Sequence, residues 1–383
     1  MLKCFVFLFL SISVTLSGNA QNEQVNVKEI PVELIGESQS VAPITNVTSL
    51  GLNISDGSFD MYVADIFTSA VLQFSLNKDR LILEKEIGRN GRGPGEFNDV
   101  SNIQVLQNGK LLVYDKNLLR TTIFDNHGGV DKIFNITSTG NSRHTPMLMV
   151  ARNNSNNSFY GISKQYFRAT DDFDKQRKII LQEFDTNGSV IKDTVLFKNS
   201  SEALVVLNQG DMSVNPNYIF GSKSIFRFYN DSIYYGWTGK NKIEVYTGDG
   251  KYKNEFKLPI NSVVPITKND IAIAKKTTSK IFKSAIEKQA PEYWPNYHDF
   301  VIDDEGRIWL ASSEHLNKNK RIWYVLNADN KKIIGKVSLS ADFNIFSIKG
   351  DYIAGEEFIY NGKEAIATLK LYKIIGSFYE RTK

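Results

Sequence analysis

Short apolar strands recur along this chain. Six of them combine an apolar run with small residues, at 61–65, 111–115, 159–163, 233–237, 308–312 and 351–355. Each follows a tight turn of Gly, Asn or Asp, residue types that accept the positive φ angles of short hairpin loops. Another strand-like segment precedes each turn, so the pattern predicts six β-hairpins.

A third strand-like segment follows every predicted hairpin, at 71–76, 121–125, 180–185, 243–247, 322–327 and 367–372. A polar turn and a fourth segment follow five of them, at 81–87, 130–136, 190–197, 252–258 and 332–339. The predicted unit is a four-stranded antiparallel meander. Because a lone meander cannot bury both faces, we predict an all-β fold in which six meanders stack radially as the blades of a six-bladed β-propeller.

The sixth unit lacks a fourth strand of its own. The segment 25–34 (VNVKEIPVEL) is strand-like and has no other partner. We predict that this N-terminal strand completes the last blade. Such a closure joins the two ends of the chain and removes an exposed sheet edge.

The stretch between the fourth and fifth blades predicts a helical insertion at about 266–292. Apolar residues recur there at approximately helical spacing, Thr267 or Asn269 can cap the first turn, and Pro291 ends the pattern.

The first 20 residues have the pattern of a secretory signal peptide. Lys3 precedes an apolar run at 5–16, and small residues lead to a cleavage point after Ala20. The run is too short to span a bilayer. We therefore expect an extracytoplasmic protein, periplasmic or secreted, whose mature chain (21–383) is one propeller domain.

Composition and charge narrow the range of partners. Aromatic residues make up 12% of the chain, which favours strands. The net charge is +4, from 46 basic and 42 acidic residues, and no dense basic run offers a surface for nucleic acid. No later segment reaches the ~20 apolar residues of a membrane span. We expect a monomer that has no membrane span and does not bind nucleic acid.

Residues 88–97 (GRNGRGPGEF) carry the most specific motif. With the strand MYVAD at 61–65, this segment resembles the G-x-x-G-x-G-P-G-E-F connection of bacterial six-bladed β-propeller proteins related to NHL repeats. A second likeness covers 266–309, where the helical insertion precedes the motif DDEGRIW. The third and fourth blades depart from the family pattern, because their second strands lack an Ala-Asp end. The resemblance implies the fold and leaves the activity open.

The long loops of the predicted meanders all fall on one face of the disc. Loops between strands one and two, and three and four, are short turns on one face. The other loops hold every long segment: 88–99, 137–146, 164–178, 198–222, 261–297 and 313–320. Long loops on a rigid scaffold commonly bind ligands, although they can also be tolerated decoration.

Five basic residues fall in these long loops: Arg89, Arg92, Arg143, His144 and Arg168. Together they could form a mouth for carboxylate or sulfate groups, since guanidinium groups bind such anions bidentately. Singly, each could equally be a solvated surface charge.

An aromatic cluster follows the predicted insertion, at Tyr293, Trp294, Tyr297 and His298. Exposed aromatic rings suit sugars or peptide side chains. The alternative is a structural role in which Trp294 seals the insertion onto the disc.

The sequence offers no catalytic signature. There is no G-x-S-x-G elbow and no paired-histidine zinc motif, and the single cysteine, Cys4, lies within the signal. Asn102, Asp299 and Asn344 are dispersed candidates for a metal in the central channel. We expect no catalytic residue, metal or cofactor, and predict an exported, non-catalytic module that binds a glycan, peptide or partner protein on the long-loop face. The alternative is a metal-dependent lyase or lactone hydrolase that acts at the channel.

Overall fold

The computed structural model describes residues 27–38, 44–55, 58–65, 67–137, 145–154, 157–164, 177–208, 211–260, 263–314, 319–361 and 364–376. The predicted signal peptide lies outside these ranges. No helix among the described residues is long and apolar enough to cross a membrane.

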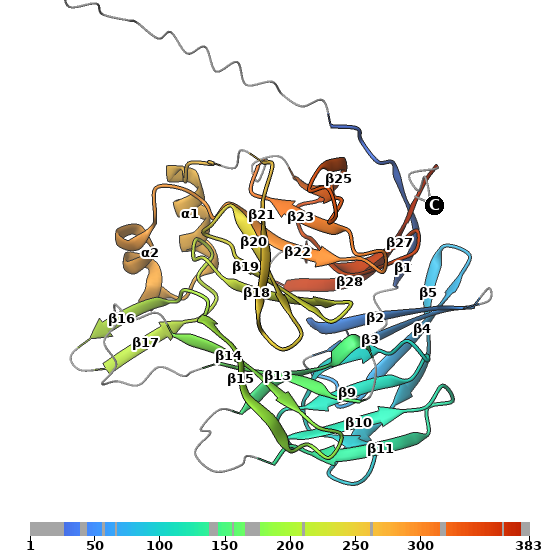
Figure 1. Ribbon diagram of the computed structural model, residues 1–383. Helices are drawn as coiled ribbons and strands as arrows, with labels where there is room; N and C mark the ends of the chain where they lie inside the picture. Colours follow the sequence, from blue (N-terminus) through green and yellow to red (C-terminus); the bar gives the residue numbers. More distant parts are fainter. Residues whose placement is uncertain are drawn as a thin grey trace, which may run out of the picture.

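Six four-stranded antiparallel blades stand side by side around a ring (Figure 1), which confirms the predicted six-bladed propeller. Blade 1 consists of β2 (Val47–Ser55), β3 (Ser58–Asp65), β4 (Val71–Asn77) and β5 (Arg80–Ile87). Blade 2 consists of β8 (Val100–Val105), β9 (Leu111–Asp115), β10 (Arg120–Phe124) and β11 (Val130–Asn135). Blade 3 consists of β12 (Pro146–Ala151), β13 (Phe159–Lys164), β14 (Lys178–Phe184) and β15 (Val190–Asn199).

The remaining blades follow the same order of strands. Blade 4 consists of β18 (Ser224–Tyr229), β19 (Ser232–Trp237), β20 (Lys242–Thr247) and β21 (Tyr252–Lys257). Blade 5 consists of β22 (Tyr297–Ile302), β23 (Ile308–Ser312), β24 (Lys320–Leu326) and β25 (Ile333–Ser340). Blade 6 consists of β26 (Phe343–Lys349), β27 (Tyr352–Asn361), β28 (Glu364–Ile374) and the N-terminal strand β1 (Val32–Ser38).

The N-terminal strand closes the ring, as predicted, although its bounds differ. β1 pairs antiparallel with β28 and touches β5 of blade 1 in parallel, which joins blades 6 and 1 into one sheet. The strand begins at Val32, whereas the sequence pattern placed it at 25–34. Upstream of it, the Ile30 backbone N–H donates to the Lys336 carbonyl of blade 5 at 2.8 Å. The chain therefore contacts the fifth blade before it completes the sixth.

Packing between neighbouring blades forms the core. All residues of β9 and β23 are buried, because each of these strands is covered by a blade on either side. Between blades 5 and 6, the rings of Trp309, Trp323 and Phe343 share one cluster and are at most 1% exposed. Burial of such large side chains stabilises the fold, whose described residues contain no cysteine.

The helical insertion is confirmed between blades 4 and 5. It contains α1 (Lys268–Thr277), a 3-10 turn (Lys280–Phe282) and α2 (Lys283–Gln289). Thr267 caps α1 in a capping box with Asp270, in which each residue accepts a hydrogen bond from the other's backbone.

The largest element that the sequence pattern did not predict is a hairpin. The segment expected as a long loop, 198–222, contains the hairpin β16 (Leu204–Asn208) and β17 (Asp211–Asn215). It projects from the disc beside the helices (Figure 1) and packs on them through Leu204, Phe220 and Ile286. The hairpin and the helices therefore form one projecting wall on the long-loop face.

Smaller elements complete the described chain. β6 (Arg89–Asn90) and β7 (Glu96–Phe97) pair in parallel within the connection from blade 1 to blade 2, and a short 3-10 turn spans Arg152–Asn154.

Candidate functional site

Two buried aspartates tie down the long loops of blades 1 and 2. The Asp115 carboxylate accepts hydrogen bonds from the backbone N–H groups of Asn98 (2.6 Å) and Leu118 (2.9 Å), which lie in the loops before β8 and after β9. Asp65 binds the backbone N–H groups of Thr45 and Asn46 in the same way. These carboxylates hold the two loops of each blade together on the long-loop face.

Blades 3, 4 and 5 lack this aspartate. The strand register places Ser163, Trp237 and Ser312 at the position that Asp115 occupies in blade 2. The sequence showed this departure for blades 3 and 4. Over these three blades, no carboxylate at this position joins the connecting loops.

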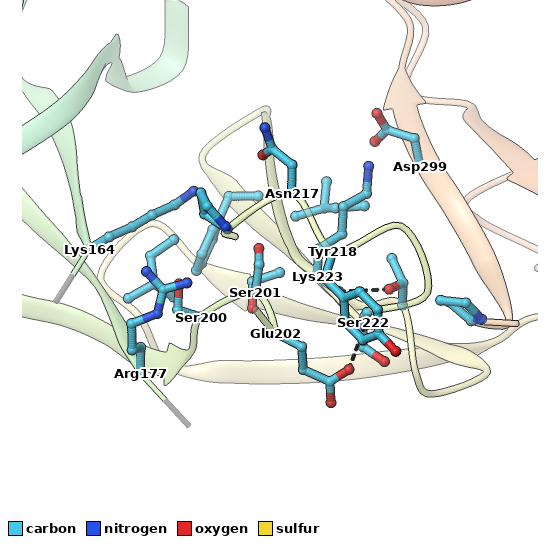
Figure 2. Close-up of a pocket in the computed structure, with 18 of the residues that line it drawn as sticks. Lys164, Arg177, Ser200, Ser201, Glu202, Asn217, Tyr218, Ser222, Lys223 and Asp299 are labelled. Carbon is cyan, nitrogen blue, oxygen red and sulfur yellow. Dashed lines mark hydrogen bonds between the residues drawn. The ribbon is translucent and has the colours of Figure 1, made fainter. Parts of the chain in front are cut away.

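A pocket with a volume of about 990 Å³ opens on the long-loop face over blades 3, 4 and 5. Its walls come from β12, β13 and β14, the segment after β15, the β16–β17 hairpin and the starts of β18 and β22. Figure 2 shows the side chains of Lys164, Arg177 and Lys223 among those that line it. Its apolar lining includes Leu148, Ile162, Ile179, Met212, Val214 and Ile219.

Most of the charged side chains in the lining are cationic. Its described residues include Lys164, Arg177, Lys223 and Arg227 against the carboxylates of Glu202 and Asp299. Both carboxylates are engaged, since Asp299 pairs with Arg227 at 2.9 Å and Glu202 accepts from the Ser222 N–H at 2.7 Å. Burial lowers the pKa of Lys164, and the positive charges of Arg177 and Lys223 lower it further.

His298 lies on the blade 5 side of the pocket. Its Nε2 atom is buried and has no hydrogen-bond partner among the described residues. Burial, with smaller contributions from Arg321 and Lys223, lowers the pKa of the imidazole to about 3. The ring is therefore neutral near pH 7.

The predicted aromatic cluster divides between the pocket and the insertion. Tyr297 and His298 line the pocket, and Tyr297 is fully buried. Trp294 meets the Phe220 ring edge-on, with ring centroids 4.8 Å apart, and its backbone N–H donates to the Val264 carbonyl. That ring joins the insertion to the base of the β16–β17 hairpin, in keeping with the structural alternative. Tyr293 is 43% exposed and is not part of the pocket lining.

The described arginines of the predicted basic mouth lie elsewhere. Arg89 and Arg92 belong to the connection between blades 1 and 2, and Arg89 pairs with Glu96 at 2.9 Å. Arg143, His144 and Arg168 fall outside the described residues. The cations that the structure brings together are Lys164, Arg177 and Lys223, which the sequence did not single out.

The three candidates for a channel metal are engaged separately. Asn102 donates to the Met149 carbonyl (2.6 Å) and accepts from the Met149 N–H (2.8 Å), linking blades 2 and 3. Asp299 pairs with Arg227, and the Asn344 side chain interacts with Glu356. No group of three or more His, Cys, Asp or Glu side chains in the described ranges is placed to hold a metal ion.

Comparison with known proteins identifies the fold alone. No family model matches the chain, and no curated protein is similar to it in sequence. A DUF4221-family protein from Bacteroides vulgatus aligns with a TM-score of 0.52 at 12% identity, over 91% of this chain and 98% of that one. A protein of Bacteroides fragilis, provisionally assigned as exported, aligns with a TM-score of 0.49 at 11% identity, over 91% and 99%. Virginiamycin B lyase from Staphylococcus aureus aligns with a TM-score of 0.41 at 12% identity, over 91% and 99%.

Proposed function

We propose that this chain is an exported, non-catalytic binding module, and that it binds a glycan, peptide or partner protein in the pocket over blades 3, 4 and 5. The pocket carries this proposal. Its volume of about 990 Å³ is in the range of ligand sites, and apolar walls surround a few polar groups, as is typical of such sites. The signal-like pattern at the N-terminus supports export.

The surrounding architecture favours recognition at this place. The pocket is walled by strand ends of three blades, so its walls are held by the rigid ring. The β16–β17 hairpin adds a projecting wall that a larger ligand, such as a peptide or glycan chain, could follow.

A pocket-filling variant tests the proposal. The purified protein is screened by thermal shift against glycans and peptides, since a ligand that binds only the folded state raises the unfolding temperature. Leu148, which lines the pocket and is 37% exposed, is replaced by Trp. We expect Leu148→Trp to weaken every hit by roughly tenfold or more, because the larger ring occupies ligand volume.

Ile191→Trp is the matched control, because Ile191 is an exposed apolar residue on the outer strand of the same blade. It should leave binding unchanged. A panel without a hit, or hits that bind Leu148→Trp with wild-type affinity, would contradict the proposed site.

A further inference from the structure

Three polar side chains lie at the same end of the blade 3 strands, at the rim of the pocket. Lys164 lies opposite Ile179 in the β13–β14 register, and Arg177 precedes Ile179 by two residues, on the same face. The β14–β15 register, carried one residue further, places Ser200 opposite Arg177, and the Ser200 N–H donates to the Arg177 carbonyl. We call Lys164, Arg177 and Ser200 the cationic edge (Figure 2).

Two groups of the cationic edge make no hydrogen bond with any described residue. Ser200 is 1% exposed, and its Oγ has no hydrogen-bond partner among the described residues. Within the same described ranges, Lys164 Nζ makes no hydrogen bond or ion pair. Such groups are unfavourable when left unpaired. An oxyanion at the edge would accept hydrogen bonds from both groups and offset the repulsion that Lys164 experiences from Arg177 and Lys223.

An apolar surface adjoins the cationic edge. Ile162 precedes Lys164 by two residues on the same face, and Leu148 pairs with Ile162 across the β12–β13 register. Ile179 continues this surface onto β14. We call Leu148, Ile162 and Ile179 the apolar shelf; all three line the pocket.

We propose that the pocket takes an amphipathic organic anion, with its carboxylate, sulfate or phosphate group at the cationic edge and its apolar part on the apolar shelf. This inference rests on the proposed function, since it names the ligand class of the same pocket. It explains why the edge combines a point charge, a planar guanidinium and a hydroxyl donor, which together suit a multi-oxygen anion.

Two probes with the same number of carbon atoms, one with an anionic and one with a neutral head group, test this inference. Octanoate and 1-octanol have the same carbon chain, and their binding to the purified protein is measured by isothermal titration calorimetry. We expect octanoate to bind and 1-octanol to bind roughly tenfold more weakly, because only octanoate can pair with the cationic edge. Octyl sulfate in place of octanoate then distinguishes a preference for sulfate from one for carboxylate.

Variants assign the effect to the edge. Lys164→Met keeps an unbranched side chain of nearly the same length and removes the charge, and should weaken octanoate roughly tenfold without changing 1-octanol. Ser200→Ala should weaken octanoate about threefold. Lys132→Met, on β11 of blade 2, removes a charge far from the pocket lining and should change neither.

The inference is overturned if octanoate does not bind, if both probes bind alike, or if Lys164→Met keeps the wild-type affinity for octanoate. If both probes bind alike and Leu148→Trp abolishes both, the pocket remains the binding site and only the anionic ligand class is wrong. The two proposals can therefore fail separately.

Discussion

The Asp115 carboxylate, which is 0% exposed, accepts a 2.6 Å hydrogen bond from the backbone N–H of Asn98 in the connection that precedes its blade. Three further N–H groups, those of Asp99, Asn117 and Leu118, bind the same carboxylate. One side chain thus satisfies four backbone donors from two loops.

Replacing this aspartate should therefore be costly. We expect Asp115→Ala to lower the free energy of unfolding by roughly 3 kcal/mol, because several backbone donors lose an ionised acceptor. Ser163→Ala is the matched control at the same register position of blade 3, where the hydroxyl makes one 3.3 Å hydrogen bond to Gln182. Its cost should stay below about 1 kcal/mol. Equal costs in urea unfolding would show that the aspartate does not hold the loops.

The blades could be predicted from the sequence because their inner strands contain short apolar runs that follow turn residues. In blade 2, the buried run at Leu111–Asp115 follows the turn at Gly109, whose φ is +78°. The start of the N-terminal strand could not be read in this way. Ile30 is 2% exposed and continues the apolar pattern of the segment, yet it belongs to the contact with blade 5.

The pocket could be predicted less well than the blades. The cationic edge depends on cross-strand register, which brings Lys164 beside Arg177 although a loop separates them in the chain. A single sequence shows no such pairing. The sequence does contain a pattern typical of the β16–β17 hairpin. The strand-like segments VVL and MSV lie on either side of a short polar stretch that contains Gly210.

A buried ion pair in the DDEGRIW motif supports blade 5. Asp303, whose side chain is 0% exposed, accepts from Arg307 Nε at 2.6 Å and from Trp309 Nε1 at 2.8 Å. Asp303→Asn removes the charge and should lower the free energy of unfolding by roughly 3 kcal/mol, because the Arg307 guanidinium loses its buried counter-ion.

Glu305→Gln is the control for this pair. Glu305 contacts the same arginine at 3.0 Å, but its side chain is 55% exposed, so its loss should cost less than about 1 kcal/mol. Chemical denaturation of both variants measures the difference. A ranking in which Glu305→Gln costs as much as Asp303→Asn would contradict a stabilising role for the buried pair.

His298 should make the stability of the protein depend on pH. Its pKa is about 3 in the folded state against 6.5 for an ordinary histidine, so between these values the unfolded chain binds the proton more strongly. Stability is therefore present above pH 6.5 and is lost as the pH falls towards 3, by at most about 1.4 kcal/mol per pH unit.

The comparison that isolates this effect is between the wild type and His298→Gln. Carboxylates also titrate in this window, but they contribute to both proteins. We expect the difference in unfolding free energy between the two to change as the pH falls from 6.5, with the wild type losing more. Parallel pH curves would mean that His298 does not remain neutral in the folded protein.

Alanine variants of two glycines with positive φ distinguish the cost of backbone strain from the cost of a steric clash. Gly188 (φ +81°) lies in the turn before β15, and a Cβ there would come within 2.0 Å of the Asn135 carbonyl oxygen of blade 2. A Cβ at Gly350 (φ +54°) would meet no described atom within 4 Å. Both alanine variants bear the cost of the left-handed conformation, about 1 kcal/mol. Only Gly188→Ala must also displace a neighbouring blade, so its unfolding free energy should fall further, by roughly 2 kcal/mol more. If thermal unfolding ranks the two variants equally, the Gly188 turn does not pack against blade 2 as closely as described.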